Sequence, residues 1–334
     1  MAKPRFPVFL AIVVLFTTFG VAQSQSDDAV HLTPRSAPAP AKFPEFTGDA
    51  DILEAHVKPL RVDVDLVQVP VTVTDVRNHP VLDLTKEDFE LTEAGQPQQI
   101  RYFSSEDQPI SVGVLLDLSR SMTNKIEAAR EALGQFFDNC NPADDYFVIT
   151  FADRPSVLAD VSRSIGHIQA QLATAEPAGH TALLDAIYMG VHKLRSAQYK
   201  RRALLIISDG GDNHSRYSAR EIKELVQEAD VEIYAIGLFD KVFRTPEEWA
   251  GKKLLNEITG ATGGRTATVS NLRNLPDVAS EISRELRSRY LLGYNPQAGS
   301  RDGKWRKLRV RLTPSAKTTE LQVYAKRGYQ APAK

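Results

Sequence analysis

The chain has almost no cysteine: Cys140 is the only one among 334 residues. A single cysteine excludes an intramolecular disulfide, so the fold must be stabilised by packing. Cys140 follows Phe136 and Phe137 on an amphipathic segment. This position predicts a buried, inert thiol rather than a reactive one.

The sequence also lacks an excess of either charge. It carries 41 basic and 42 acidic residues, a formal charge of −1, and loss of a segment containing Lys3 and Arg5 would give 39 minus 42, or −3. This balance gives no reason to expect nucleic acid or an anionic membrane as a partner. The alternating basic residues Lys307, Arg309 and Arg311 are accordingly interpreted as the solvated face of a strand.

Two hydrolase signatures are missing. No H-E-x-x-H sequence is present, which disfavours a zinc protease. Ser119 and Ser121 do not stand in a G-x-S-x-G elbow, which disfavours a serine hydrolase. His180 and His214 are interpreted as surface or loop residues rather than catalytic bases.

Residues 1–22 have the composition of an export signal. Lys3 and Arg5 precede an uncharged apolar run, and the small residues 20–22 suit cleavage after Ala22. The alternative is an uncleaved membrane anchor, because the uncharged stretch of 17 residues is at the short limit for spanning. No cysteine stands directly after the run, so a lipoprotein is not expected. We expect a periplasmic, cell-surface or extracellular protein, and mass spectrometry that finds Met1 or Ala2 at the mature terminus, rather than Gln23, would favour the anchor.

The next segment, residues 23–58, is rich in Pro, Ala and Ser and is predicted to be a disordered tether. Residues 59–106 then alternate apolar and polar side chains as β-strands do, and Pro70 predicts an edge strand there. Residues 290–330 show a second group of strand patterns. Each group gives about three strands with one apolar face, too few for a stable domain, so we expect both to form one small β-sandwich.

The most informative stretch is residues 110–122, ISVGVLLDLSRSM. An unbroken apolar run predicts a strand buried on both faces, as in parallel sheets. It ends in Asp117, Ser119 and Ser121. A carboxylate and two hydroxyls on one turning loop can bind a hard cation such as Mg²⁺ or Ca²⁺. On this stretch alone the favoured interpretation is a helix start near Asn124 and Glu127, in which the acid and the hydroxyls have only a capping role.

Two later segments favour the cation site. Thr181 stands in a G-x-T-x-L-x-D-A sequence that opens a helix, and Asp209 follows a second buried strand in S-D-G. Loops beyond the carboxyl ends of strands in a doubly wound sheet share one rim, so Asp117 and Asp209 can meet there. Together these residues resemble the metal-ion-dependent adhesion site of the von Willebrand factor A-type domain, and all five positions match: Asp117, Ser119, Ser121, Thr181 and Asp209.

The flanking sequences sharpen this resemblance. VTVTDVRNHPVLDLTKEDFELTEAGQPQQIRYF before the domain, and YLLGYNP with KRGYQ after it, resemble the acidobacterial VWFA-related family of exported proteins. The resemblance covers about residues 60–330. It implies the fold and the metal site, whereas the function of that family is obscure.

The organisation between the flanks supports an α/β fold. Strands are predicted at 146–151, 203–207 and 231–236, and helices at 124–139, 164–174, 181–195, 219–229, 248–259 and 275–288. Alternation of this kind indicates a doubly wound, mostly parallel sheet in residues 107–289, inserted between the two β segments. Ser218 with Glu221 predicts a capping box, and Gly260 predicts a helix end.

The resemblance implies a binding protein rather than an enzyme. In such domains the metal, here expected to be Mg²⁺ with Ca²⁺ or Mn²⁺ as alternatives, keeps an open position that an Asp or Glu of a protein partner completes. A structural or assembly protein of the cell envelope, in which the metal only braces the rim, is the competing hypothesis. A haloacid-dehalogenase-like phosphatase is less favoured, because its chemistry needs a second acid where this chain has Ser119.

Overall fold

The computed structural model describes residues 66–105, 107–239, 246–296, 302–314 and 320–333. The expected export signal (1–22) and tether (23–58) lie outside these residues. Within the described part of the chain, no helix is long and apolar enough to cross a membrane.

A six-stranded sheet forms the centre of residues 107–289. Its strand order is β10-β9-β8-β5-β6-β7, and only the edge strand β7 runs antiparallel to its neighbour. The strands are β5 (Ser111–Asp117), β6 (Asp145–Phe151), β7 (Pro155–Ser162), β8 (Arg202–Ser208), β9 (Glu232–Leu238) and β10 (Thr266–Val269). Every residue of β5 is buried, as the apolar run predicts. The mostly parallel, doubly wound sheet is therefore confirmed, although β7 and β10 are strands that the sequence patterns did not predict.

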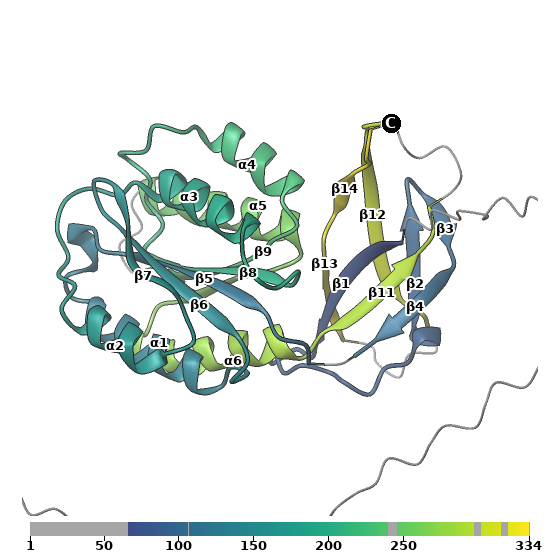
Figure 1. The fold of residues 1–334 in the computed structure, drawn as a ribbon, viewed down its shortest axis with the longest axis horizontal. Coiled ribbons are helices and arrows are strands. Elements are labelled where there is room, and N and C mark those ends of the chain that lie inside the picture. Colours follow the sequence, from purple (N-terminus) through teal and green to yellow (C-terminus); the bar gives the residue numbers. More distant parts are fainter. Residues whose placement is uncertain (1–65, 106, 240–245, 297–301, 315–319, 334) are drawn as a thin grey trace, which may run out of the picture. The chain divides into compact units, whose positions relative to one another are not determined.

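Helices cover both faces of this sheet (Figure 1). One face carries α3 (Leu183–Arg195), α4 (Ala219–Glu228) and α5 (Pro246–Thr262); the other carries α1 (Ile126–Asp138), α2 (Ile165–Ala173) and α6 (Leu275–Arg287). Each layer of helices packs on its own cluster of buried apolar side chains. The two clusters meet only through the sheet, which is why its inner strands are apolar without alternation.

The β segments form two antiparallel four-stranded sheets with a shared apolar core. Their orders are β13-β1-β11-β4 and β14-β12-β2-β3. The first segment supplies β1 (Val67–Thr74), β2 (Phe89–Glu93), β3 (Gln96–Gln98) and β4 (Ile100–Ser104); the second supplies β11 (Tyr290–Tyr294), β12 (Trp305–Leu312), β13 (Gln322–Ala325) and β14 (Gly328–Gln330). Each sheet contains strands of both segments. The expected sandwich is confirmed, and neither segment completes a sheet without the other.

The prediction from Pro70 that its strand lies at the edge of a sheet is wrong. Strand β1 lies inside its sheet, between β11 and β13. Pairing with β13 begins only at Val71, however, so Pro70 has a strand neighbour on one side, opposite Leu291. A residue without an N–H group is tolerated where one side of the strand is unpaired.

Helix ends show where local signals held and where they failed. The capping box of Ser218 and Glu221 is present at the start of α4. Helix α5 continues past Gly260 to Thr262, and it is Gly263, with φ +95°, that follows its last residue. That left-handed conformation favours glycine, so the end predicted at Gly260 was three residues early. Likewise α1 begins at Ile126, after a short 3-10 turn, η2 (Arg120–Met122), and Asn124 does not cap it.

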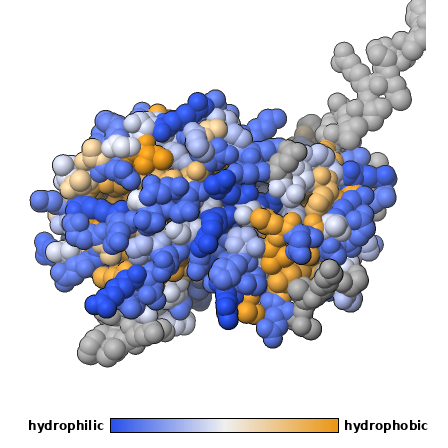
Figure 2. Space-filling view, turned by 90° about the horizontal axis from the view of Figure 1, so that it is seen from below, coloured by the Kyte–Doolittle hydropathy of each residue, from blue (hydrophilic) through white to orange (hydrophobic). Residues whose placement is uncertain are grey.

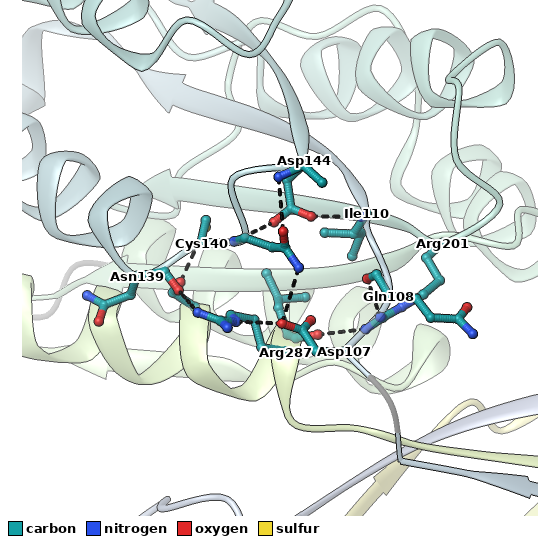
Figure 3. A network of polar contacts seen from close by, with 12 residues as sticks. Asp107, Gln108, Ile110, Asn139, Cys140, Asp144, Arg201 and Arg287 are labelled. Carbon is teal, nitrogen blue, oxygen red and sulfur yellow. Dashed lines mark hydrogen bonds and ion pairs between the residues drawn. The ribbon is translucent and has the colours of Figure 1, made fainter.

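The entry to the inserted domain is tied to its exit (Figure 3). The carboxylate of Asp107 accepts a hydrogen bond from Arg287 Nε at 2.9 Å, next to the end of α6. Arg201 donates to the carbonyl of Gln108, on the segment that leads into β5, and, at 2.9 Å, to that of Leu286. Both chain crossings are therefore held by two guanidinium groups, and α6 continues almost directly into β11.

The remaining two 3-10 helices are η1 (Lys86–Asp88), next to β2, and η3 (Leu272–Asn274), before α6.

Hydrophilic residues dominate the face drawn in Figure 2, where the hydrophobic colour gathers in one larger area. Among the large hydrophobic residues that the structure describes in the β segments, Val76 and Leu82 are the most exposed, at 58% and 55%.

Tyr290 is expected to hold the sandwich together. Its fully buried ring lies 5.1 Å from that of Phe89, and its hydroxyl donates to Val81 O at 2.8 Å and accepts from Leu84 N at 3.1 Å. Tyr290→Ala should lower the free energy of unfolding by about 3–5 kcal/mol because it leaves a cavity. Tyr290→Phe should cost about 1–2 kcal/mol because it removes only the hydroxyl.

Tryptophan fluorescence can follow this module separately. The chain has two tryptophans, and only Trp305, on β12, belongs to the sandwich. Urea titrations in a Trp249→Phe background therefore report sandwich unfolding. Tyr102→Phe, at a ring 39% exposed on β4, is the control and should be near neutral. If Tyr290→Ala shifts the midpoint no more than this control, the shared core is wrong.

Candidate metal centre

Asp117 ends β5 with its side chain fully buried. One carboxylate oxygen accepts from Ser119 N at 2.8 Å, and the other accepts from the hydroxyl of Ser208 at 2.6 Å. Burial and the nearby charge of Asp209 raise the pKa of Asp117 to about 6, although these hydrogen bonds act to lower it. The carboxylate is thus held in one orientation at an electrostatic cost.

The two serines of the D-x-S-x-S sequence lie together. Their hydroxyl oxygens are 2.9 Å apart, with Ser119 2% exposed and Ser121 on the surface. Residues 120–122 form η2, which turns the chain so that positions 119 and 121 face each other. The loop therefore presents two hydroxyl oxygens beside a buried carboxylate.

Thr181 lies on a neighbouring loop that hydrogen bonds join to both other loops. Its N–H donates to Asn213 Oδ1 at 2.9 Å, and its carbonyl accepts from the N–H groups of Asn213 and His214, each at 3.1 Å. On the other side, Arg120 N donates to Gly179 O at 3.2 Å. Thr181 is 4% exposed. Residues 117–121, 179–181 and 209–214 therefore form one rim at the carboxyl ends of β5 and β8.

Asp209 is placed by a tight backbone approach. Gly210, directly after it, has φ +92°, and a Cβ atom on Gly251 of α5 would lie 1.4 Å from Gly210 O. Glycine is needed at both positions, because one requires a left-handed conformation and the other has no room for a side chain. The carboxylate of Asp209 is 9% exposed and bonds to Lys125 Nζ at 3.0 Å.

Several residues that support the rim escaped the sequence analysis. Asp185, the acid of the G-x-T-x-L-x-D-A sequence, is 4% exposed and accepts from Arg216 N, Arg216 Nε and Tyr217 N at 2.9–3.2 Å. Its pKa is lowered, since these hydrogen bonds outweigh the effect of burial. Asp153 accepts from His180 N at 2.8 Å. The motif itself could have pointed to Asp185; nothing local pointed to Asp153 or Lys125.

The two histidines behave as surface residues with one unexpected feature. His180 and His214 are both exposed, and their rings stack with centroids 5.1 Å apart and planes at 21°. They come from the two loops that Thr181 and Asn213 join. Cys140, by contrast, is half-buried against the α1–α6 core; burial raises the pKa of its thiol to about 11, in line with the inert cysteine that the sequence predicts.

The donor set fits a hard divalent cation. Two buried carboxylates and neutral hydroxyl oxygens are ligands that Mg²⁺ and Ca²⁺ accept. Among the described residues, no group of three or more His, Cys, Asp or Glu side chains is placed to hold a metal. The rim therefore depends on its hydroxyls. A cation between Asp117 and Asp209 would offset both the burial and the repulsion by Asp209 that raise the pKa of Asp117.

Comparison with known proteins gives two matches in sequence. The sequence profile of the von Willebrand factor type A domain matches residues 112–211. Inter-alpha-trypsin inhibitor heavy chain H4 of Homo sapiens is 27% identical over 146 residues, which cover 39% of this chain and 16% of that protein. This chain thus matches only a small part of the length of that relative.

Solved structures give partial matches to the chain. A von Willebrand factor type A protein from Catenulispora acidiphila gives a TM-score of 0.47 at 12% identity, over 81% of this chain and 74% of that one. The PilB minor pilin from Streptococcus sanguinis gives 0.46 at 14% identity, over 55% and 62%. An aerotolerance-related membrane protein from Bacteroides fragilis gives 0.44 at 20%, over 53% and 98%.

The raised pKa of Asp117 predicts a pH-dependent stability in the metal-free protein. The folded pKa, about 6, exceeds the ordinary value of 3.8, so the folded state binds this proton more tightly. Stability from this group is full below pH 4 and is lost as the pH rises through 6. Asp117→Asn should therefore gain stability relative to the wild type, by up to about 3 kcal/mol, as the pH rises from 4 to 7.5.

Urea unfolding in EDTA at several pH values measures this gain. Asp160→Asn is the control, because the exposed Asp160 pairs with Lys193 and its pKa is lowered. That variant should show no gain with pH. An Asp117→Asn curve parallel to the wild-type curve across pH 4–7.5 would contradict the burial of an ionised carboxylate.

Proposed function

Because the chain contains a von Willebrand factor type A domain, we propose that it is an exported binding protein that captures a protein partner through a divalent cation. Domains of this type often mediate protein–protein interactions. Asp117, Ser119, Ser121, Thr181 and Asp209 would hold the cation, Mg²⁺ first and Ca²⁺ or Mn²⁺ as alternatives. When bound, the metal offers an open coordination position to an Asp or Glu carboxylate of the partner.

One observation carries the proposal. The fully buried carboxylate of Asp117 lies beside the hydroxyls of Ser119 and Ser208 and within electrostatic reach of Asp209, and this surrounding raises its pKa to about 6. A cation bound at such a site stabilises the ionised form of the buried carboxylate. Because the other three ligands are neutral hydroxyl oxygens, a bound divalent cation would stay electrophilic enough to take a further carboxylate.

The surroundings of the rim favour an acidic partner. Arg120 and Arg154 are exposed on the loops that carry or adjoin the site residues. The guanidinium of Arg216 is 83% exposed while it pairs with Asp185. Positive groups around an anion-binding point raise the rate of encounter with an acidic surface and suppress cationic partners.

The same burial argues against phosphatase chemistry. A nucleophilic aspartate must reach the phosphorus of its substrate, but the side chain of Asp117 has no exposed area, and both its oxygens accept hydrogen bonds. The position two residues later is Ser119, an unactivated hydroxyl and a poor general acid. We therefore propose a module without catalytic activity.

Metal-dependent capture is the central prediction. Mg²⁺ should raise the melting temperature of the full chain, because a ligand that binds the folded state stabilises it by mass action. At a Mg²⁺ concentration of one hundred times Kd, the free energy of unfolding should rise by about 2.7 kcal/mol. The immobilised chain should then retain a partner from the exported protein fraction of its host in Mg²⁺ and release it in EDTA. Asp117→Ala should abolish both effects while the domain stays folded.

Asp160→Ala, which removes an exposed carboxylate of β7, serves as the matched control and should behave as the wild type. A melting shift that survives Asp117→Ala would show that the metal site is assigned wrongly. Capture that is equal in Mg²⁺ and EDTA, despite a normal melting shift, would favour the structural or assembly protein in which the metal only braces the rim.

A further inference from the structure

Lys125 brings a cation of the chain itself to the acidic rim. It immediately precedes α1, and its Nζ lies 3.0 Å from Asp209 Oδ2 and 3.5 Å from the carbonyl oxygen of Leu238. The side chain of Lys125 is 21% exposed and that of Asp209 is 9% exposed. Solvent and salt therefore screen this pair less than they screen a surface ion pair.

The position of the ammonium group is set by three separate segments. The turn after η2 supplies Lys125, the end of β8 supplies Asp209, and the last residue of β9 supplies the Leu238 carbonyl. An exposed lysine can pair with several groups in turn, whereas the ammonium of Lys125 is held between the carboxylate of Asp209 and the carbonyl of Leu238.

Lys125 and a divalent cation cannot both pair fully with the carboxylate of Asp209. Asp117 and Asp209 contribute −2, and Lys125 brings the sum of these three groups to −1; Arg120 and Asp212, also on the rim, cancel each other. A divalent cation drawn to the two carboxylates meets an ammonium already bonded to one of them. It must displace that ammonium, or leave Asp209 with Lys125 and interact through water.

We propose that Lys125 is a tethered counter-ion that competes with the divalent cation for Asp209 and thereby sets the metal affinity of the rim. The proposal rests on the metal-binding function proposed above and adds a residue that this function does not require. The lysine affects metal binding and carboxylate binding in opposite directions. Lys125 weakens metal binding, and it leaves the loaded rim with a net charge of +1 instead of 0, which favours an incoming carboxylate.

Titration of the full chain with Mg²⁺ by calorimetry, and with Mn²⁺ by the loss of the free-ion magnetic resonance signal, tests the competition. Lys125→Met removes the charge at similar length, Lys125→Arg keeps it, and Lys193→Met removes a lysine of similar exposure, 23%, from an ion pair with Asp160. Lys125→Met should lower Kd for both metals by about tenfold, within the usual range of coupling between two binding events. The other two variants should stay within about twofold of the wild type.

Melting in EDTA gives a second, metal-free measurement. Lys125→Met should melt below the wild type, because the carboxylate of Asp209 is left partly buried without its partner. Saturating Mg²⁺ should then produce a larger upward shift in Lys125→Met than in the wild type. A lysine that only stabilised the fold would lower the melting temperature in EDTA and in Mg²⁺ by the same amount.

The outcomes separate this inference from the proposed function. Equal metal affinity of wild type and Lys125→Met overturns the competition and leaves the metal site standing. Binding by Lys125→Met alone supports the competition in its strongest form, with the lysine as the resident cation. Binding by neither protein overturns both, since the rim then has no affinity with which Lys125 competes.

Discussion

The fold of the inserted domain is arranged around one costly feature, an aspartate carboxylate at the end of a strand that is buried on both faces. Strand β5 lies in the middle of the six-stranded sheet, and its last residue, Asp117, has no exposed area. A buried charge needs fixed partners. The partners come from the same loop, through Ser119, and from the adjacent parallel strand, through Ser208. The hydrogen bonds to this carboxylate thus determine how the loops of the rim are arranged.

The second constraint is the dependence of the two β segments on each other. Strand β11 pairs with β1 and β4, and β12 pairs with β2, so each sheet is completed across the insertion. Tyr290 begins β11 only three residues after α6 ends, and Arg287 ties that helix to Asp107 at the entry. The inserted domain and the sandwich are consequently joined at two adjacent crossings that share polar contacts, with no flexible linker at the exit.

Much of the domain was readable from the sequence, because the signals were local. Apolar runs predicted the inner strands, helical periodicity predicted six helices, and Ser218 with Glu221 predicted the start of α4. Strand β7 was missed because it is a short-range hairpin partner at an exposed edge, with a mixed burial pattern. The end of α5 was misplaced because Gly260 continues the helix, and only Gly263 takes the left-handed conformation.

The sequence by itself determined the alternation of strands and helices, the acid and hydroxyls that end β5, and the need of each β segment for a partner. Only the tertiary structure decided how the two segments interleave, and which groups face Asp209 and Thr181. Lys125 meets Asp209 across 84 positions of the chain, and His180 meets His214 across a loop crossing. Such contacts depend on strand order and loop packing, and these are set by the sum of many burial contacts rather than by any local pattern.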